Sequence, residues 1–304
     1  MAARPGSLEE AFGSLARLEA AAWRAGDPIL LREAAERCGA LLDLDPLRPP
    51  ARAAVRRVLT PVAPLPDRAR RAALGFTRQF CLDVAALDEM TRVEMTEALG
   101  PVAFDFVQAV FVFDYTPRVR AALAALSDGT DGLAPDPAAT EGVDPDADGS
   151  LWEALDAFLG AVGRLRRLDP VTSELVRLRG ARQHNCRLCQ SLRSRAAIRE
   201  GADDRLFGLV DRPAADDLSS RHRAALALTD AVIWHPARLD PRLVAEVRSE
   251  LSADERTELV LDVMRNAANK IAVALHADAP HVASGVEIYD IDDDGRSVYG
   301  LSLP

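Results

Sequence analysis

The sequence predicts an all-α protein made of two related helical domains, with a short β-hairpin at its C-terminal end. Hydrophobic residues make up 48% of the 304 residues and aromatic residues only 5%, so the expected cores are aliphatic. The alanine, leucine and arginine that dominate the chain are strong helix formers. Only residues 286–304 alternate apolar and polar positions, around Asp294-Gly295, which is typical of a hairpin.

An acidic segment at residues 127–150 predicts the domain boundary. It is rich in Asp, Gly and Pro and poor in apolar residues, as flexible linkers are. We therefore expect one helical domain over residues 1–126 and a second over residues 151–304. Domains of about 150 residues are ordinary in size.

A weak internal repeat relates the two halves. Arg71–Leu74 resembles Arg223–Leu226, and Glu94 and Glu258 are each followed by Asp or Asn eleven residues later. We interpret this as a duplicated helical unit whose first copy is degenerate, because the first half has no Cys-x-x-Cys. Chance similarity between alanine-rich helices is the alternative.

The second half begins with two predicted helices. Apolar residues at helical spacing indicate the first over residues 152–162. Asp169-Pro170 is a typical N-cap and first helical position for the next. This second helix is expected to break near Asn185, which then caps a helix that carries a Cys-x-x-Cys in its first turn and ends near Gly201.

Three further helices are expected downstream. The first runs from about Ser220 to Trp234, and a short one starts at Asp240-Pro241. A long helix starts at Ser252, with Glu255 completing a capping box. Its apolar positions form a stripe that we expect to be buried: Leu259, Val263, Ala267, Ile271 and Ala274.

Charge and hydropathy narrow the range of partners. The net charge is −10, whereas nucleic-acid binding needs clustered cations, so we expect no nucleic-acid partner. The N-terminus lacks the apolar core of a secretory signal, and no 18 consecutive residues are all apolar. The sequence therefore predicts a cytoplasmic protein without a membrane partner.

The chain has four cysteines, and two of them form the candidate site. Structural disulfides are rare in the cytoplasm, so a close pair there indicates redox chemistry or metal binding. Cys38 and Cys81 stand alone in apolar contexts and are expected in the core. Cys186 and Cys189 share one helical face, with Cβ atoms roughly 5–6 Å apart. Because a disulfide needs about 3.8 Å, a small adjustment lets this pair alternate between dithiol and disulfide.

The surroundings of the pair favour thiolate. A helix start and nearby cations lower a cysteine pKa, and each pKa unit corresponds to about 1.4 kcal/mol. Thiolate is the form that attacks peroxides and disulfides. The candidate cations are Arg187, Arg193, Arg182 and Arg195.

The segment around the pair resembles the alkylhydroperoxidase D and carboxymuconolactone decarboxylase family. Glu174 precedes Cys186 by twelve residues, as in the family motif, and small residues follow the pair. The NKIAVAL stretch around Asn269 is similar to the family's closing helix. The resemblance covers about residues 151–277 and implies an all-helical fold, a homo-oligomer and a proton relay through glutamate and histidine.

The resemblance also implies roles for the residues of the motif. Cys189 would attack the peroxide, Cys186 would be the more exposed resolving cysteine, and Glu174 would be the relay carboxylate. The substrate would be a hydroperoxide or a disulfide, the electron donor a dithiol or thioredoxin-like reductant, and the protein an antioxidant peroxidase without a cofactor or metal.

Two positions depart from the family pattern. The family has histidine just before the second cysteine and again four residues after it, where this chain has Leu188 and Arg193. Arginine stays charged and relays no proton, but it can stabilise a thiolate and orient Glu174. Peroxide cleavage needs a proton for the leaving oxygen, and His184 is the substitute candidate, although a solvated loop histidine is the alternative.

Metal binding is an alternative for two features. A structural zinc site needs four ligands, and there is no second Cys-x-x-Cys. Asp144 to Gly149 and Asp290 to Gly295 resemble the start of calcium loops, but leucine stands at position 12 of both, so turn chemistry explains them better.

Two other functions stay open. A lyase of the carboxymuconolactone decarboxylase type does not depend on a cysteine pair. A non-catalytic redox-sensing or structural helical module would use the pair for a single oxidation rather than turnover.

Overall fold

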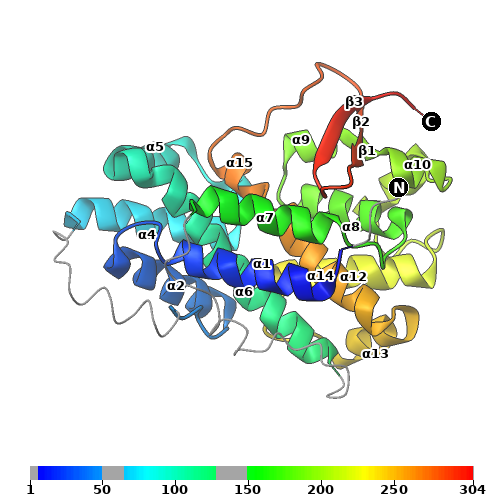
Figure 1. Ribbon diagram of the computed structural model, residues 1–304, viewed down its shortest axis with the longest axis horizontal. Helices are drawn as coiled ribbons and strands as arrows, with labels where there is room; N and C mark the ends of the chain where they lie inside the picture. Colours follow the sequence, from blue (N-terminus) through cyan, green and yellow to red (C-terminus); the bar gives the residue numbers. More distant parts are fainter. Residues whose placement is uncertain (1–5, 50–64, 128–148, 304) are drawn as a thin grey trace.

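The structure is a computed structural model that describes residues 6–49, 65–127 and 149–303. Helices account for 67% of the described residues and strands for 5%, which confirms a mostly helical fold (Figure 1). A small sheet lies at one end of the helical body, beside the C-terminus.

The described part of the first half is helical. Side chains of Ser7, Asp27 and Asp88 accept backbone N–H groups at three helix starts, as N-caps do. The elements are α1 (Leu8–Ala22), α2 (Pro28–Leu42), α4 (Asp67–Leu82), η2 (Val84–Ala86), α5 (Glu89–Leu99), η3 (Gly100–Val102) and α6 (Ala103–Leu126).

Helix α6 is the central helix of the molecule. It has 24 residues and is apolar around its whole circumference, a pattern typical of a helix buried on all sides. The segment Glu89–Leu126, which contains α6, is long and apolar enough to cross a membrane by length and composition, and 56% of its most apolar window is buried inside the protein. In the fold, α6 packs against α1, α2 and α14 (Ala253–Ala267).

The second half contains the remaining described helices. The predicted caps at Asp169, Asp240 and Ser252 are confirmed, the last with a complete capping box. The elements before α14 are α7 (Leu151–Gly163), α8 (Pro170–Gln183), α9 (Arg187–Gln190), α10 (Arg195–Arg199), α11 (Asp204–Gly208), η5 (Leu209–Asp211), α12 (Ser220–Trp234) and α13 (Pro241–Glu250). After α14, α15 (Lys270–Ala274) completes the predicted buried stripe, interrupted at residues 268–269.

The helix expected from Asn185 to Gly201 is wrong. Asn185 has a left-handed φ of 51° and ends α8, and Cys186 is the N-cap of the single turn α9. The chain then forms β1 (Leu192–Ser194), which pairs in parallel with β2 (Glu287–Ile291). Pairing between strands almost 100 residues apart satisfies the backbone groups there, and no local spacing reveals it.

The predicted C-terminal hairpin is confirmed. β2 pairs antiparallel with β3 (Ser297–Leu301), giving the strand order β1-β2-β3. In the turn, Asp292 accepts N–H groups from Asp294 and Arg296, so turn chemistry explains this Asp-rich loop. Gly163 of α7 lets the turn pack closely, because a Cβ there would lie 2.2 Å from the carbonyl oxygen of Gly295.

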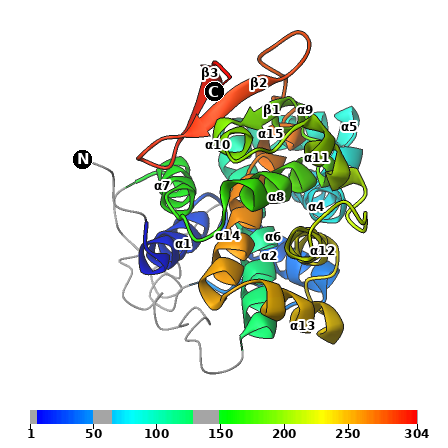
Figure 2. The same ribbon diagram turned by 90° about the vertical axis from the view of Figure 1, so that its right-hand side faces the viewer.

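The two halves share one hydrophobic core. Buried side chains form a single cluster from Ala11 to Ala274, and α1 lies against α7 while α6 lies against α14 (Figure 2). A second cluster gathers α8, α10 and η5. The predicted linker at 127–150 lies outside the described residues, apart from its two ends.

A buried ion network joins the halves at the core. Asp114 of α6 accepts hydrogen bonds from Arg118 and from Lys270, the only lysine of the chain, at 2.7 and 2.6 Å. All three side chains are at most 3% exposed. Arg118 also donates to carbonyls at the ends of α4 and α12. Two cations therefore depend on one carboxylate for their charge compensation.

Replacing Asp114 with alanine is expected to destabilise the protein by about 3–5 kcal/mol, because Lys270 and Arg118 would be left buried without their anion. Urea denaturation measures the loss. Arg205→Ala, which breaks an exposed pair with Asp217, is the matched control and should cost under about 1 kcal/mol. Equal losses in the two variants would contradict the assigned role of Asp114.

Candidate functional site

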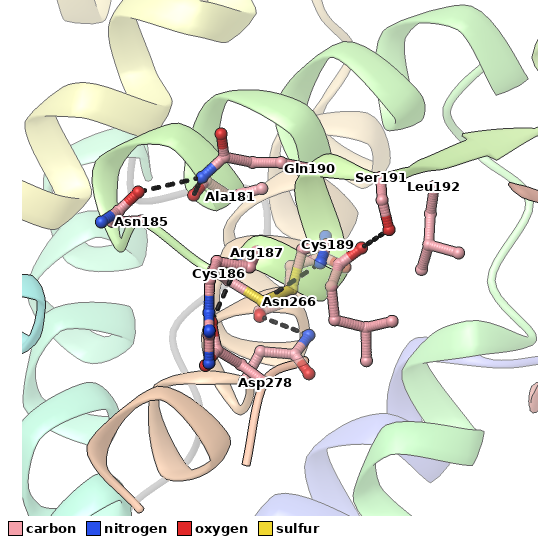
Figure 3. The surroundings of a disulfide bond; sticks show 12 residues. Ala181, Asn185, Cys186, Arg187, Cys189, Gln190, Ser191, Leu192, Asn266 and Asp278 are labelled. Atoms are coloured by element: carbon pink, nitrogen blue, oxygen red, sulfur yellow. Dashed lines mark hydrogen bonds and ion pairs between the residues drawn. A yellow bond between two sulfur atoms is a disulfide. The ribbon is translucent and has the colours of Figure 1, made fainter. Parts of the chain in front are cut away.

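The candidate site centres on a disulfide between Cys186 and Cys189. The S–S distance is 2.06 Å and the two Cα atoms are 5.3 Å apart (Figure 3). Cys186 follows the left-handed residue that ends α8, and Cys189 lies in the single turn of α9. The two predicted site cysteines are therefore brought together, within one helical turn.

The start of α9 is fully hydrogen-bonded. Asp278 accepts the N–H of Arg187 through its carboxylate and the N–H of Leu188 through its carbonyl. The N–H of Cys189 points to Sγ of Cys186 at 3.2 Å. The helix has only four residues, so the stabilisation of a thiolate comes from this N–H group rather than from an extended helix dipole.

The two sulfurs differ in their access to a cavity. Cys186 is 1% exposed and Cys189 is 5% exposed, so the expectation that Cys186 is the more exposed cysteine is wrong. Ala181 of α8 packs in one cluster with the two cysteines, and it accepts the N–H of Cys186. Cys189 lines a cavity of about 290 Å³, together with Leu188, Arg177, Arg265, Asn266, Asn269, Tyr289 and Tyr299 among others. This is the sulfur that a small molecule in the cavity would meet first.

Glu174 lies on α8 and is held by a closed set of donors. Arg177 donates to both of its oxygens at 2.7 and 2.8 Å, Tyr289 donates its hydroxyl at 2.8 Å, and Ser194 donates its N–H at 3.1 Å. Burial raises the pKa of Tyr289 far above its ordinary range, so this hydroxyl stays a donor. Glu174 is 1% exposed.

Arg177 links Glu174 to the cysteine turn. Its guanidinium donates to the carbonyl oxygens of Cys189 at 2.7 Å and Leu192 at 2.9 Å. The guanidinium also lies 5.1 Å from the ring centre of Tyr289. The arginine that orients Glu174 is thus Arg177 and not Arg193, contrary to the sequence-based expectation.

The arginines expected to stabilise thiolate are engaged with carboxylates. Arg193 donates to the carbonyls of Gln190 and Leu192, lies over the ring of Phe207, and approaches Asp204 at 3.7 Å. The other three each pair with a different acid: Arg187 with Asp278, Arg182 with Asp211 and Arg195 with Asp290. The charge of each of these arginines is therefore compensated by a carboxylate.

His184 is buried rather than solvated, because α8 ends against α6. Its side chain is 7% exposed, and Nε2 lies 2.8 Å from the hydroxyl of Tyr115. Burial, together with the charges of Lys270 and Arg118, holds the pKa of His184 well below its usual value. A neutral imidazole in this position is suited to fixing the end of α8 before Cys186.

A second cavity of about 170 Å³ adjoins the first. Both are lined by Arg177, Arg265, Asn266 and Tyr289. The second is also lined by Glu174 and by two carboxylates of α14, Glu258 and Asp262.

Burial dominates the chemistry of the two carboxylates of α14. It raises the pKa of Glu258 to about 7 and that of Asp262 to about 6. Their side chains carry only 3% and 7% exposure. Both groups therefore exchange protons near neutral pH.

Four residues of this region are not among the predicted site residues: Arg177, Tyr289, Glu258 and Asp262. Arg177 carries a local signal, because opposite charges three residues apart on a helix meet. Glu258 and Asp262 each stand one residue before an apolar position of the predicted stripe, which is a weaker signal. Tyr289 reaches Glu174 across 115 residues, and nothing near it in the sequence indicates that contact.

The other cysteine pair lies in the core, as predicted. Cys38 of α2 and Cys81 of α4 are buried free thiols whose Sγ atoms are 3.0 Å apart. Burial and the contact with Cys38 raise the pKa of Cys81, so it stays a thiol. Among the residues that the structure describes, no group of three or more His, Cys, Asp or Glu side chains is placed to hold a metal ion.

Fold and site together define a mostly helical protein with a buried Cys-x-x-Cys disulfide beside two polar cavities. The chain is 47% identical over 227 residues to the uncharacterized protein Rv2313c of Mycobacterium tuberculosis strain H37Rv. The aligned segment covers 74% of this chain and 79% of that protein. The uncharacterized protein MT2376 of strain CDC 1551 matches to the same extent. The chain belongs to the family of these mycobacterial proteins. No family model and no solved structure matches it.

Replacing Glu174 with glutamine is expected to destabilise the protein by about 3 kcal/mol, because Arg177 would keep its buried charge and lose its anion. Urea denaturation under oxidising conditions measures this. Glu200→Gln, at an exposed position after α10, is the control and should change little. If Glu174→Gln unfolds at the same urea concentration as the native protein, Glu174 does not anchor the site.

Replacing Glu258 with glutamine is expected to change the pH dependence of stability. The folded pKa of about 7 exceeds the ordinary value of 4.5, so the native protein loses stability as pH rises from 4.5 to about 7. The variant lacks this loss and should unfold at a higher temperature than the native protein at pH 8, but not below pH 4.5. Melting curves across this range measure it, and parallel curves for the two proteins would contradict the assignment.

Proposed function

We propose that the protein is a thiol-dependent oxidoreductase that reduces hydroperoxides, using Cys186 and Cys189 as its redox pair. The observation that carries the proposal is a Cys-x-x-Cys closed as a disulfide within one turn, with Cys189 facing a polar cavity. Such a pair can be opened by a dithiol donor and closed again by an oxidising substrate.

The reaction balances with two thiols and one hydroperoxide. The thiolate of Cys189 attacks the distal peroxide oxygen, so an S–O bond forms, the O–O bond breaks, and the departing alkoxide takes a proton to leave as an alcohol. Cys186 then attacks the sulfenic sulfur, the S–O bond breaks, and hydroxide takes a proton to leave as water. A dithiol or thioredoxin-like donor reduces the disulfide afterwards.

The placement of the sulfurs supports this order of events. Cys189 lines the cavity, whereas Cys186 is the more buried of the two and its Sγ lies at bonding distance from that of Cys189. The N–H of Cys189 pointing at Cys186 favours the thiolate of the resolving cysteine. The resemblance to alkylhydroperoxidase D implies the same attacking and resolving roles, although it gives Cys186 the greater exposure. A cytoplasmic homo-oligomer is part of the same proposal.

A redox-sensing module is the second candidate, and the burial of both sulfurs favours it over the lyase alternative. A sensor oxidises once per molecule, whereas a peroxidase turns over with a dithiol donor. Counting hydroperoxide molecules consumed per protein molecule separates these two functions.

Replacing Cys189 with serine is expected to abolish hydroperoxide consumption. Cys186→Ser, oxidised without a dithiol, should consume one equivalent and stop at the sulfenic acid, because no disulfide with Cys186 can form. Consumption of tert-butyl hydroperoxide with and without dithiothreitol measures both. Cys38→Ala, which removes a core thiol outside the site, should retain activity. Full activity of Cys189→Ser would disprove the attacking role, and a native protein that consumes one equivalent and stops would favour the sensor.

A further inference from the structure

The proposed cysteine chemistry needs a side chain that gives and takes protons. The resemblance implies Glu174 for this role, but the oxygens of Glu174 are already held by hydrogen bonds. Each oxygen that leaves takes a proton, and each thiol that reacts releases one. Glu174 accepts hydrogen bonds from Arg177, Tyr289 and Ser194, so its oxygens are fixed as acceptors. A carboxylate whose two oxygens are already held by these donors is poorly suited to giving and taking protons.

The two histidine positions of the family motif give no carrier either. They hold Leu188 and Arg193 in this chain, and neither side chain exchanges protons at neutral pH. His184 is buried against Tyr115 and does not line either cavity. A carrier therefore has to come from another element of the site.

Helix α14 presents a polar face to both cavities. Glu258, Asp262 and Asn266 follow one another at four-residue intervals, so they lie in one row with a rise of about 6 Å per step. The carboxylates line the smaller cavity, Asn266 lines both, and Asn269 continues the row into the larger one. Asn266 is also among the residues surrounding the disulfide in Figure 3. The row thus runs from two acids to the cavity that Cys189 lines.

Asp262 is directed into the cavity without a close partner. It is 7% exposed, and within the described ranges no hydrogen bond reaches its carboxylate; the nearest cation, Arg265, lies 3.8 Å away. Glu258 accepts the backbone N–H of Arg167 at 2.6 Å, and a backbone hydrogen bond from Leu168 also lowers its pKa. A buried carboxylate that lacks internal donors needs a partner in the cavity, and water or a bound substrate supplies one.

We propose that Glu258 and Asp262 are the proton donors and acceptors of the Cys186–Cys189 pair, acting along the polar face of α14 through the two cavities. The inference rests on the proposed thiol redox function. It assigns to Glu258 and Asp262 the proton relay that the resemblance implies for Glu174. In each cycle the acid pair takes up the two protons that the two thiols release, and returns one to the alkoxide and one to the hydroxide that leave.

The protonation behaviour of the pair suits this task. Burial raises both pKa values into the range from about 6 to about 7, where an acid gives and regains protons readily at neutral pH. Arg265 and Arg166 face Asp262 and lower its pKa, while the charge of Asp262 raises that of Glu258. The two carboxyls are therefore expected to titrate as a coupled pair.

The test is single-turnover reduction of the disulfide by dithiothreitol between pH 5 and 9. Acid quenching and alkylation, followed by mass spectrometry, report Cys186 and Cys189 separately from the core thiols. For the native protein, the rate constant per dithiothreitol thiolate should fall as pH rises through about 6 to 7, because the protonated acid supplies the leaving thiolate with its proton.

Asp262→Asn and Glu258→Gln are expected to lose this pH dependence and to react at least about tenfold more slowly at pH 6. Asp254→Asn, an exposed carboxylate at the start of the same helix, is the matched control and should follow the native profile. Profiles of both site variants that superimpose on the native profile would overturn the inference. Circular dichroism confirms that each amide variant is folded.

Failure of the proposed function would look different. A native protein that shows the pH dependence but consumes no hydroperoxide would retain the proton relay for thiol–disulfide exchange and lose the peroxidase assignment. A native protein that consumes hydroperoxide, with site variants equally active at every pH, would keep the peroxidase and lose the relay.

Discussion

The buried contact between Arg177 and Glu174 holds the site together. Arg177 joins the carboxylate to the backbone oxygens of Cys189 and Leu192, so α8, α9 and β1 are fixed by a single guanidinium. Tyr289 of β2 closes the other side of the carboxylate. A buried charge pair is tolerable only when its remaining donors and acceptors are satisfied, and here they are. The cysteine turn is therefore held on rigid elements rather than on a loose loop.

In the proposed mechanism, different carboxylates anchor the cysteine turn and exchange protons. Glu174 accepts hydrogen bonds on both oxygens, which makes it an anchor for the turn. Glu258 and Asp262 line the smaller cavity, and burial raises the pKa of both carboxyls toward neutral pH, which leaves their protons exchangeable. If Glu258 and Asp262 carry the protons as proposed, Leu188 and Arg193 need not do so at the two positions where the alkylhydroperoxidase D motif has histidine.

The sequence predicted those features that depend on local patterns. The bounds of α12 and the capping box of α14 follow from cap residues and periodicity, and the hairpin follows from alternation around Asp294-Gly295. The pairing of the cysteines follows from their spacing. The errors lie where distant segments override local signals. The helix expected after Asn185 is replaced by β1, because β1 pairs with β2. Arg187, expected to stabilise a thiolate, forms an ion pair with Asp278 instead. Such contacts become visible only when the chain is folded.

The first half of the chain contributes to the site, although it contains no Cys-x-x-Cys of its own. Tyr115 of α6 holds His184, two residues before Cys186. One residue earlier, Asp114 holds Lys270 at the start of α15, from which the chain leads to the Asp278 that caps α9. Both flanks of the disulfide are thus tied to neighbouring residues of one central helix. Helix α6 buries these polar and charged groups inside an otherwise apolar core. It therefore supports the turn that contains Cys186 and Cys189. Duplication of a helical unit, where one copy keeps the chemistry and the other supplies this support, would account for a first half without a Cys-x-x-Cys.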